Sequence, residues 1–209
     1  MIYLDHAATT PMRASALAAF VEASQSPGNP SSVHGAGQEA RRRLEDARQI
    51  LAGSLGCEPV EVILTAGGTE AINLALKGLY WQRRAEDPAR RRILVPGGEH
   101  HATIDSVEWL AQHEGASIEW LELDAEGVLR PEVLASAIAR DPASVALVSA
   151  LWVNNEIGTI APVVELAAVC ADAGVPLHLD AVAAFGHLPL AIADAAGRPA
   201  RAGEPDSPP

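Results

Sequence analysis

A glycine-containing turn within Thr65–Gly78 could bind a phosphate group. The sequence TAGGTEAINLALKG places two glycines between an expected strand and a helix that begins near Thr69. Free N–H groups at the start of such a helix, together with the positive end of its dipole, favour a bound anion. Glycine lets the backbone approach that anion closely. The turn matches neither the P-loop nor the dinucleotide fingerprint, and a plain glycine turn with Thr69 as N-cap explains it equally well.

Two further polar stretches follow apolar runs. His100 and His101 come just after the run RILV. They could be loop residues, metal ligands or an aromatic lid over a flat cofactor ring, although a metal would need further ligands that the sequence does not provide nearby. Asn154, Asn155 and Glu156 follow the run VALVSALW. A turn explains paired asparagines, and a carboxamide directed at a bound oxygen explains them equally well.

Asp180 ends the run PLHLD, where a carboxylate is costly unless it has a partner. A protonated ring nitrogen is one partner that fits. Pyridoxal phosphate has such a nitrogen, and an acid opposite it keeps the ring cationic and able to accept electrons. The alternative is a structural Asp that caps the next turn.

Short apolar runs alternate with stretches of helical spacing, which predicts an α/β fold with a mostly parallel sheet. The expected strands are Glu61–Thr65, Arg92–Val95, Ser117–Leu123, Val145–Trp152 and Val175–Leu179. The expected helices are Pro11–Ser24, Gly37–Leu55, Thr69–Glu86, His101–Glu114, Pro131–Arg140 and Pro162–Ala173. Ligands of such a sheet bind beyond the carboxyl ends of its strands, which is where the polar residues above fall.

The composition is that of an acidic globular chain. It has 209 residues, of which 48% are apolar and 20% charged, and a formal net charge of −12. This charge argues against binding to nucleic acid or anionic membranes, and no segment approaches the roughly 20 apolar residues of a membrane span. Cys57 and Cys170 form no metal-binding pattern and suit a reducing cytosol. We therefore expect a cytoplasmic protein with no signal peptide and no metal site.

The order of these features closely resembles the cysteine desulfurases of the class V aminotransferase family. A phosphate turn, a histidine, Asn-Asn-Glu and His-x-Asp follow one another at successive strand ends, and YLDHAATTP and GNPSSVHGAG also look like signatures of this family. The resemblance extends from Tyr3 to about Leu190. It implies the large domain of fold-type I enzymes, with helices on both faces of the sheet and pyridoxal 5′-phosphate as the cofactor.

The resemblance also implies an activity and partners. The family reaction converts L-cysteine to L-alanine and passes the sulfur to an enzyme cysteine, from which it can supply iron–sulfur cluster assembly. Members are homodimers and deliver sulfur to an acceptor or scaffold protein.

The resemblance implies a role for each matching residue. Gly68 and Thr69 would hold the cofactor phosphate, and Asp180 would pair with the pyridine nitrogen. His100 would stack on the ring and could assist proton transfer, which makes it the catalytic candidate. Asn155 would lie beside the ring hydroxyl and the substrate. Three more residues, in segments expected to line the site, are His6, Asn29 and His34.

The sequence departs from the family pattern at two points. Ala183 stands where the family has a glutamine that bonds the ring hydroxyl, a loss worth about 1 kcal/mol. The single lysine, Lys77, lies inside the helix after the phosphate turn, so it is not the Schiff-base lysine. The family carries that lysine in a Ser-x-His-Lys motif beyond the Asp, where this chain reads AGEPDSPP. The nucleophilic cysteine belongs to a later region, and Cys57 and Cys170 match neither role.

We therefore expect residues 1–196 to form an incomplete pyridoxal-phosphate-binding large domain with an N-terminal arm, and 197–209 to form a disordered Pro- and Gly-rich tail. The chain would be a cysteine desulfurase truncated before the cofactor lysine and inactive alone. Without the two strands that flank the lysine, Glu61–Thr65 would lose its neighbour and Val175–Leu179 would gain an open edge. The alternatives are a non-catalytic remnant, a dimerisation module, or a related class V lyase such as selenocysteine lyase.

Overall fold

The computed structural model describes residues 2–190, and the chain divides into two compact units between Ile63 and Leu64. The first unit contains α1 (Ala14–Ser24), α2 (Gly35–Leu55) and a short 3₁₀ turn at Pro59–Glu61. These helices confirm the two predicted from Pro11–Ser24 and Gly37–Leu55. The predicted tail at 197–209 lies outside the described residues.

The predicted strand Glu61–Thr65 is wrong. Glu61 ends the 3₁₀ turn, and residues 62–65 have no regular secondary structure. The β-branched composition favours a strand, but a strand also needs a neighbour to accept its backbone hydrogen bonds. No segment within residues 2–190 pairs with this one. Arg48 of α2 instead donates a hydrogen bond to the carbonyl of Val62.

The second unit is built on a four-stranded parallel sheet in the order β2-β1-β3-β4. Its strands are β1 (Arg92–Pro96), β2 (Ser117–Leu121), β3 (Val145–Leu151) and β4 (Leu177–Asp180). The other four predicted strands are therefore present, and the parallel α/β fold is confirmed. Within the described part of the sheet, β4 lies at an edge, as the sequence predicts.

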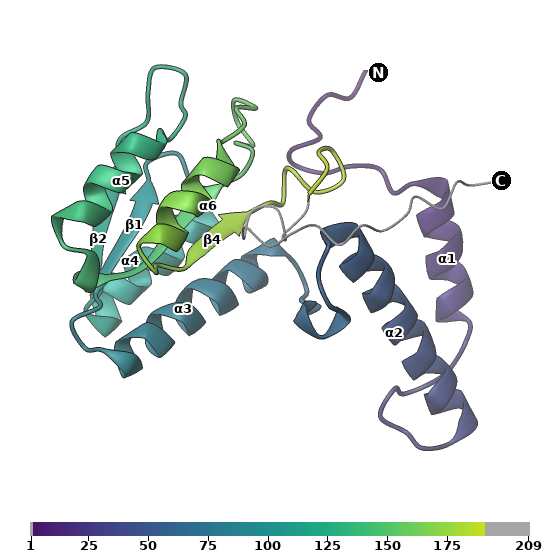
Figure 1. Ribbon diagram of the computed structural model, residues 1–209. Coiled ribbons are helices and arrows are strands. Elements are labelled where there is room, and N and C mark those ends of the chain that lie inside the picture. Colours follow the sequence, from purple (N-terminus) through teal and green to yellow (C-terminus); the bar gives the residue numbers. More distant parts are fainter. Residues whose placement is uncertain (1, 191–209) are drawn as a thin grey trace. The chain divides into compact units, whose positions relative to one another are not determined.

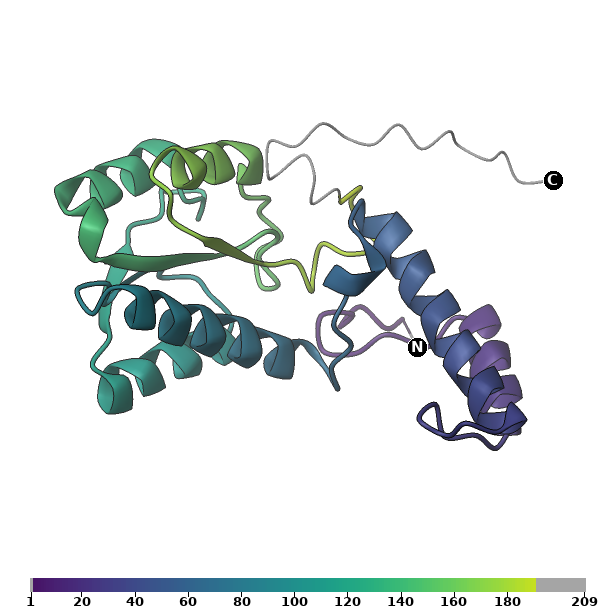
Figure 2. The same ribbon diagram turned by 60° about the horizontal axis from the view of Figure 1, so that its bottom comes forward.

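Helices cover both faces of this sheet (Figures 1 and 2). The helices α3 (Gly68–Glu86) and α4 (His101–Glu114) pack on one face, and α5 (Pro131–Arg140) and α6 (Val163–Asp172) pack on the other. Successive side chains of β1 alternate between the two sides, because strand side chains have a period of two. Ile93 and Val95 join the core beneath α3 and α4, whereas Leu94 joins the core beneath α5 and α6.

The amino ends of the strands are tied together by Arg92. Its guanidinium pairs with Glu119 on β2 at 2.6 Å and donates to the carbonyls of Ala137 and Asp141, both at 2.9 Å. Charge-assisted bonds of this kind are stronger than neutral ones. The amino edge of the sheet is therefore fixed to α5 and to the segment before β3.

Two features are absent from the described residues. No helix among residues 2–190 is long and apolar enough to cross a membrane. In the same part of the chain, no three or more His, Cys, Asp or Glu side chains are grouped so that they could hold a metal ion.

Candidate functional site

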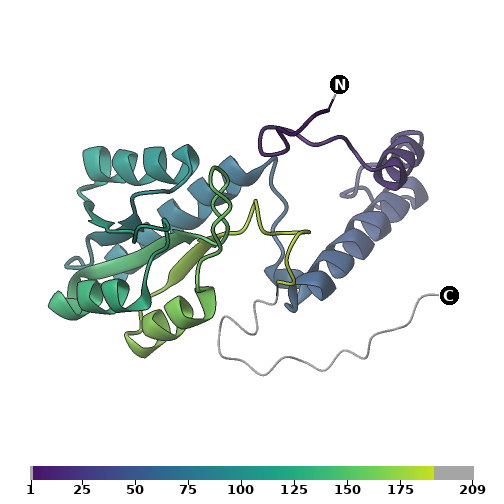
Figure 3. The same cartoon turned by 90° about the horizontal axis from the view of Figure 1, so that it is seen from above.

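The predicted site residues follow strands whose carboxyl ends meet at one edge of the sheet. The strand order reverses between β1 and β3, and such a reversal opens a crevice where α/β sheets bind ligands. His100 follows β1, Asn155 follows β3, and Asp180 is the last residue of β4. Figure 3 shows the chain leaving β3 and β4 at the same end of the sheet.

The phosphate turn is formed by backbone groups at the start of α3. The helix begins at Gly68, and its N-cap is Gly67, which makes no side-chain cap. Thr69 is therefore the second helical residue, which excludes the alternative that it is the N-cap. The N–H groups of a first helical turn lack intrahelical partners. The carboxylate of Glu70 accepts the N–H of Ala66 at 2.7 Å. The N–H groups of Gly68 and Thr69 have no such acceptor among the described residues, so they are available to bind an anion.

The phosphate turn lies against the loop that follows Asp180. A Cβ built on Gly68 would lie 2.8 Å from Cγ2 of Val182, two residues after Asp180. A side chain at this position would require the methyl group of Val182 to move. The structure thus brings the proposed phosphate and ring-nitrogen contacts to the same place.

We expect Gly68→Ala to lower the free energy of unfolding by about 1–3 kcal/mol, because the added methyl group overpacks the contact with Val182. Val182 is 67% exposed, so Val182→Ala should itself cost little and should restore most of the loss in the double variant. Denaturant unfolding of both single variants and the double variant measures this coupling.

Gly78→Ala is the matched control for this experiment. Gly78 is also in α3, but a Cβ there would meet nothing within 4 Å, so alanine should stabilise the helix slightly. Equal losses in Gly68→Ala and in the Gly68→Ala/Val182→Ala double variant would contradict the contact.

Asp180 is a buried carboxylate with one oxygen engaged. It is 5% exposed, and Oδ1 accepts the N–H of Val182 at 3.0 Å. That bond is the turn cap that the structural alternative requires. Within residues 2–190, however, the other oxygen has no hydrogen bond and no cationic side chain forms an ion pair with the carboxylate. Such a group is costly to bury alone, so a cationic N–H donor such as a protonated ring nitrogen fits it.

His178 lies on the same face of β4 as Asp180, two residues earlier. Its Nδ1 is 2.9 Å from the hydroxyl of the buried Ser149 on β3. Burial lowers the pKa of His178, and the Asp180 carboxylate partly opposes this effect. The imidazole is therefore neutral near pH 7 and does not serve as the cationic partner of Asp180.

His100 presents a fixed and exposed ring. It is the N-cap of α4, and its Nδ1 accepts the N–H of Ala102 at 3.1 Å. This bond assigns the proton of the neutral imidazole to Nε2, which makes no hydrogen bond among the described residues. The ring can thus cover a flat ligand and offer a proton at Nε2.

The two asparagines after β3 have different surroundings. Oδ1 of Asn154 accepts the N–H groups of Glu156 and Ile157, and its Nδ2 donates to the carbonyl of Gly98 at 3.1 Å. Asn154 is therefore the turn residue and links the loops after β1 and β3. The amide of Asn155 bonds only the exposed Glu156, at 2.9 Å, which leaves its oxygen for a ligand.

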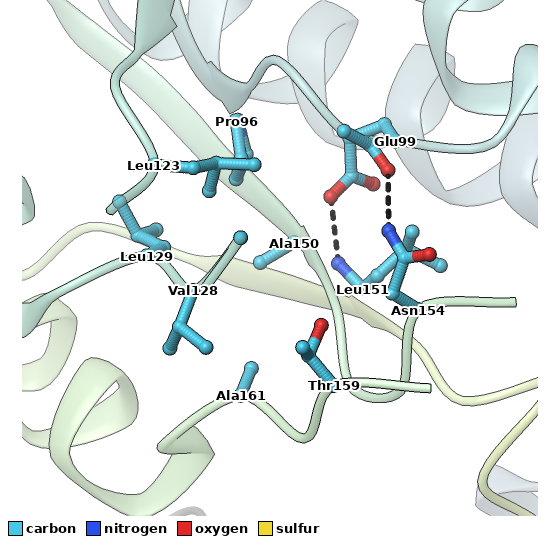
Figure 4. Close-up of a pocket in the computed structure, with 12 residues that line it drawn as sticks. Pro96, Glu99, Leu123, Val128, Leu129, Ala150, Leu151, Asn154, Thr159 and Ala161 are labelled. Atoms are coloured by element: carbon cyan, nitrogen blue, oxygen red, sulfur yellow. Dashed lines mark hydrogen bonds between the residues drawn. The ribbon is translucent and has the colours of Figure 1, made fainter. Parts of the chain in front are cut away.

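Glu99 is an element of the site that the sequence did not single out. It is 8% exposed, and its Oε1 accepts the N–H of Leu151 at 2.7 Å (Figure 4). Burial raises the pKa of Glu99 to about 7; the bond from Leu151 lowers it and the charge of Asp180 raises it. Nothing in the run PGGEHH distinguishes a buried acid from an exposed one.

A small cavity lies beside this carboxyl group. Its volume is about 30 Å³, and it lies among Glu99, Asn154, Thr159 and mostly apolar neighbours (Figure 4). Ligand pockets commonly measure about 300–1,000 Å³, so this cavity suits one or two water molecules. None of the five predicted cofactor residues lines it. It therefore lies next to the predicted cofactor contacts rather than around them.

Lys77 and Cys170 occupy structural positions, as the sequence predicts. Nζ of Lys77 lies 4.3 Å from the ring centroid of Trp109 on α4, a cation–π contact. The eight residues from Thr69 to Lys77 span about 12 Å of helix, so the amine is far from the phosphate turn. Cys170 is buried on α6, and burial raises the pKa of its thiol to about 12, which keeps it protonated at neutral pH.

Three predicted site residues lie in the first unit. Asn29 forms a local turn, in which its Oδ1 accepts the N–H of Ser31 at 2.9 Å. His34 is the N-cap of α2 without a side-chain bond, and the ring of His6 packs edge-on against Tyr3 at 5.2 Å. Their part in the site stays a prediction.

Comparison with known proteins gives a consistent result. A profile described as aminotransferase class-V matches residues 2–196. An IscS-like cysteine desulfurase of Mycobacterium tuberculosis is 52% identical over 190 residues, which are 91% of this chain and 48% of that protein. The chain thus spans about half the length of the curated relatives it matches.

Solved structures agree with these sequence matches. A NifS-like protein superposes with a TM-score of 0.84 at 31% identity, covering 91% of this chain and 51% of that one. SspA, solved in complex with cysteine, superposes with a TM-score of 0.82 at 30% identity, covering 92% and 54%.

Proposed function

The chain belongs to the aminotransferase class-V family, and we propose that it forms the cofactor-binding part of a cysteine desulfurase. The observation that carries the proposal is Asp180, a buried carboxylate with no cationic partner among the described residues. The loop that follows it lies against a helix start able to hold a phosphate. The high identity to a cysteine desulfurase supports the choice of reaction. Pyridoxal 5′-phosphate is the cofactor whose phosphate and ring nitrogen match these two features.

Each residue then has a defined task. The N–H groups of Gly68 and Thr69, with the Thr69 hydroxyl, bind the phosphate. Asp180 would hold a proton on the ring nitrogen, His100 would cover the ring, and Asn155 would direct its amide oxygen at the ring hydroxyl or the substrate. When bound, pyridoxal phosphate supplies an electron sink for the substrate carbon.

The reaction assigned to the complete site is that of L-cysteine to L-alanine, with sulfur passed to an enzyme cysteine and then to an acceptor or scaffold protein of iron–sulfur assembly. We extend the homodimer and the cytoplasmic location to this chain as parts of the same proposal. We place the cofactor lysine and the sulfur-carrying cysteine outside residues 2–190, because Lys77 lies over Trp109, Cys170 is buried and Cys57 does not match the family's cysteine.

The chain alone should bind pyridoxal phosphate reversibly and leave no adduct on Lys77, since the amine packs on Trp109 and lies about 12 Å along α3 from Thr69. Borohydride treatment followed by mass spectrometry of the peptides checks this. Lys77→Arg keeps the cationic contact and should bind the cofactor as tightly as the unaltered chain. A reduced adduct on Lys77, with alanine formed from cysteine, would contradict the proposal.

The packing of Lys77 also favours a second candidate, in which the chain binds the cofactor without catalysis. The two are separated by adding the second half of the Mycobacterium tuberculosis relative as a separate polypeptide. If the chain is part of an enzyme, alanine should form from cysteine, and removal of the lysine from the added half should abolish it. Cofactor binding without turnover in either mixture would favour the second candidate.

A further inference from the structure

The ladder between β1 and β3 stops before the strands end. Paired residues run from Arg92 and Val145 to Leu94 and Val148, so Val95 and Pro96 have no partner on β3. Pro96 has no N–H to donate. The carboxyl ends of the two central strands, where the cofactor residues begin, are therefore paired with the outer strands β2 and β4 but not with each other.

The side chain of Glu99 replaces the missing ladder bond. Its Oε1 accepts the N–H of Leu151, the last residue of β3, at 2.7 Å. Leu151 is the register partner of Asp180, and the next N–H, that of Trp152, donates to the carbonyl of Asp180 at 2.9 Å. A continuous path thus runs from Glu99 through the end of β3 to the backbone of Asp180.

The second oxygen of Glu99 is buried and has no hydrogen-bond partner within residues 2–190. The hydroxyl of Thr103 on α4, also buried, lies close enough to lower the pKa of Glu99 but makes no well-formed bond. A buried polar atom without a hydrogen-bond partner lowers the stability of the fold and therefore calls for an explanation. Here the reason offered by the geometry is the bond made by the other oxygen.

Few titratable residues lie near the carboxyl group of Glu99. On β4 the titratable residues are His178 and Asp180, and in the adjoining chain they are His100 and His101. The exposed Glu156 lies in the loop after β3. Of these, only Asp180 shifts the pKa of Glu99, which its charge raises.

We propose that Glu99 is a positioning residue that fixes the end of β3 and, through Trp152, holds Asp180 in place for the cofactor ring. The inference rests on the proposed function, because the ring nitrogen gives the position of Asp180 its purpose. Glu99 touches neither substrate nor cofactor in this account. It acts through a backbone bond and through its charge on Asp180.

The backbone part of the proposal is tested without cofactor, by hydrogen exchange of single amides. Glu99→Ala removes the acceptor, so the Leu151 and Trp152 amides should exchange at least about tenfold faster. Glu99→Gln keeps an acceptor oxygen and, when exchange is measured near pH 5, where this variant changes stability little, should leave both rates close to those of the unaltered chain. Glu108→Gln, an exposed position on α4, is the matched control. Unchanged protection of both amides in Glu99→Ala would overturn the proposal.

The positioning part is tested by the affinity for pyridoxal phosphate between pH 6 and pH 8. Glu99→Ala should weaken binding about tenfold or more, whereas Glu99→Gln should bind like the unaltered chain at pH 6. As Glu99 ionises, its charge favours a cationic ring nitrogen at Asp180, so the unaltered chain should gain about fivefold over Glu99→Gln by pH 8. A merely structural residue would give parallel pH profiles.

The outcomes separate this inference from the proposed function. Faster exchange in Glu99→Ala with unchanged cofactor affinity, or pH profiles that stay parallel, would overturn the positioning role. If the unaltered chain binds no pyridoxal phosphate, the proposed function fails and the role of Glu99 at the end of β3 is decided by the exchange rates alone.

Discussion

Replacing Asp180 by asparagine should weaken binding of pyridoxal phosphate by about 10- to 100-fold, because a charge-assisted hydrogen bond contributes about 1.5–3 kcal/mol. The amide oxygen of asparagine can still accept the N–H of Val182, which Oδ1 accepts at 3.0 Å in the structure. The loop after β4 should therefore keep its shape. What is lost is the negative oxygen that stabilises a protonated ring nitrogen. Fluorescence or absorbance titration of the two proteins measures the difference.

Two controls make this result specific. Asp105→Asn, at an exposed position on α4, should leave the affinity unchanged. A cofactor analogue with carbon in place of the ring nitrogen should bind the unaltered chain and Asp180→Asn about equally, since neither protein can then form the bond. If asparagine weakened both ligands to the same degree, Asp180 would be a structural residue only.

Glu99→Gln should stabilise the chain by about 3 kcal/mol at pH 8 but by less than about 1 kcal/mol at pH 5. The pKa of Glu99 is about 7 in the folded protein against 4.5 for the free side chain. The folded state therefore holds this proton more tightly than the unfolded state. Its contribution to stability is lost as the pH rises from about 4.5 to 7, and glutamine, which cannot ionise, avoids the loss.

Urea unfolding of both proteins at several pH values between 5 and 8 gives this comparison. The amide of glutamine can keep the bond to Leu151 and donate to the hydroxyl of Thr103, which has no partner among the described residues. Burial lowers the pKa of His178, but this residue is present in both proteins, so its contribution cancels in the difference. A stability difference that did not change with pH would show that Glu99 is not held in its neutral form.

The fold was predictable where its signals are local. The helices His101–Glu114 and Pro131–Arg140 begin and end at the predicted residues, because apolar spacing, proline and flanking residues act within one element. The run Glu61–Thr65 failed for the opposite reason. Its composition is typical of a strand, but strand formation depends on a partner elsewhere in the chain, and composition carries no information about that partner.

The candidate site divides in the same way. The glycines of the phosphate turn and the acid that ends β4 could be located because a parallel sheet brings its carboxyl ends to one edge. The role of Glu99 could not be predicted from the sequence, because it depends on a hydrogen bond to Leu151, which lies 52 positions away in the chain. Nor does the sequence show that Gly68 lies against Val182, or that Asn154, rather than Asn155, is the turn residue.

The stacking of Lys77 on Trp109 has a practical consequence for work on this protein. The chain has one lysine, so an amine-reactive fluorophore can attach to a single side chain. The terminal amine can also react, and Lys77→Arg, which carries only that second label, serves as the blank. The label would sit on α3 within contact distance of an indole on α4, and indoles quench many dyes on contact. The emission of one dye would then report directly on the packing of these two helices.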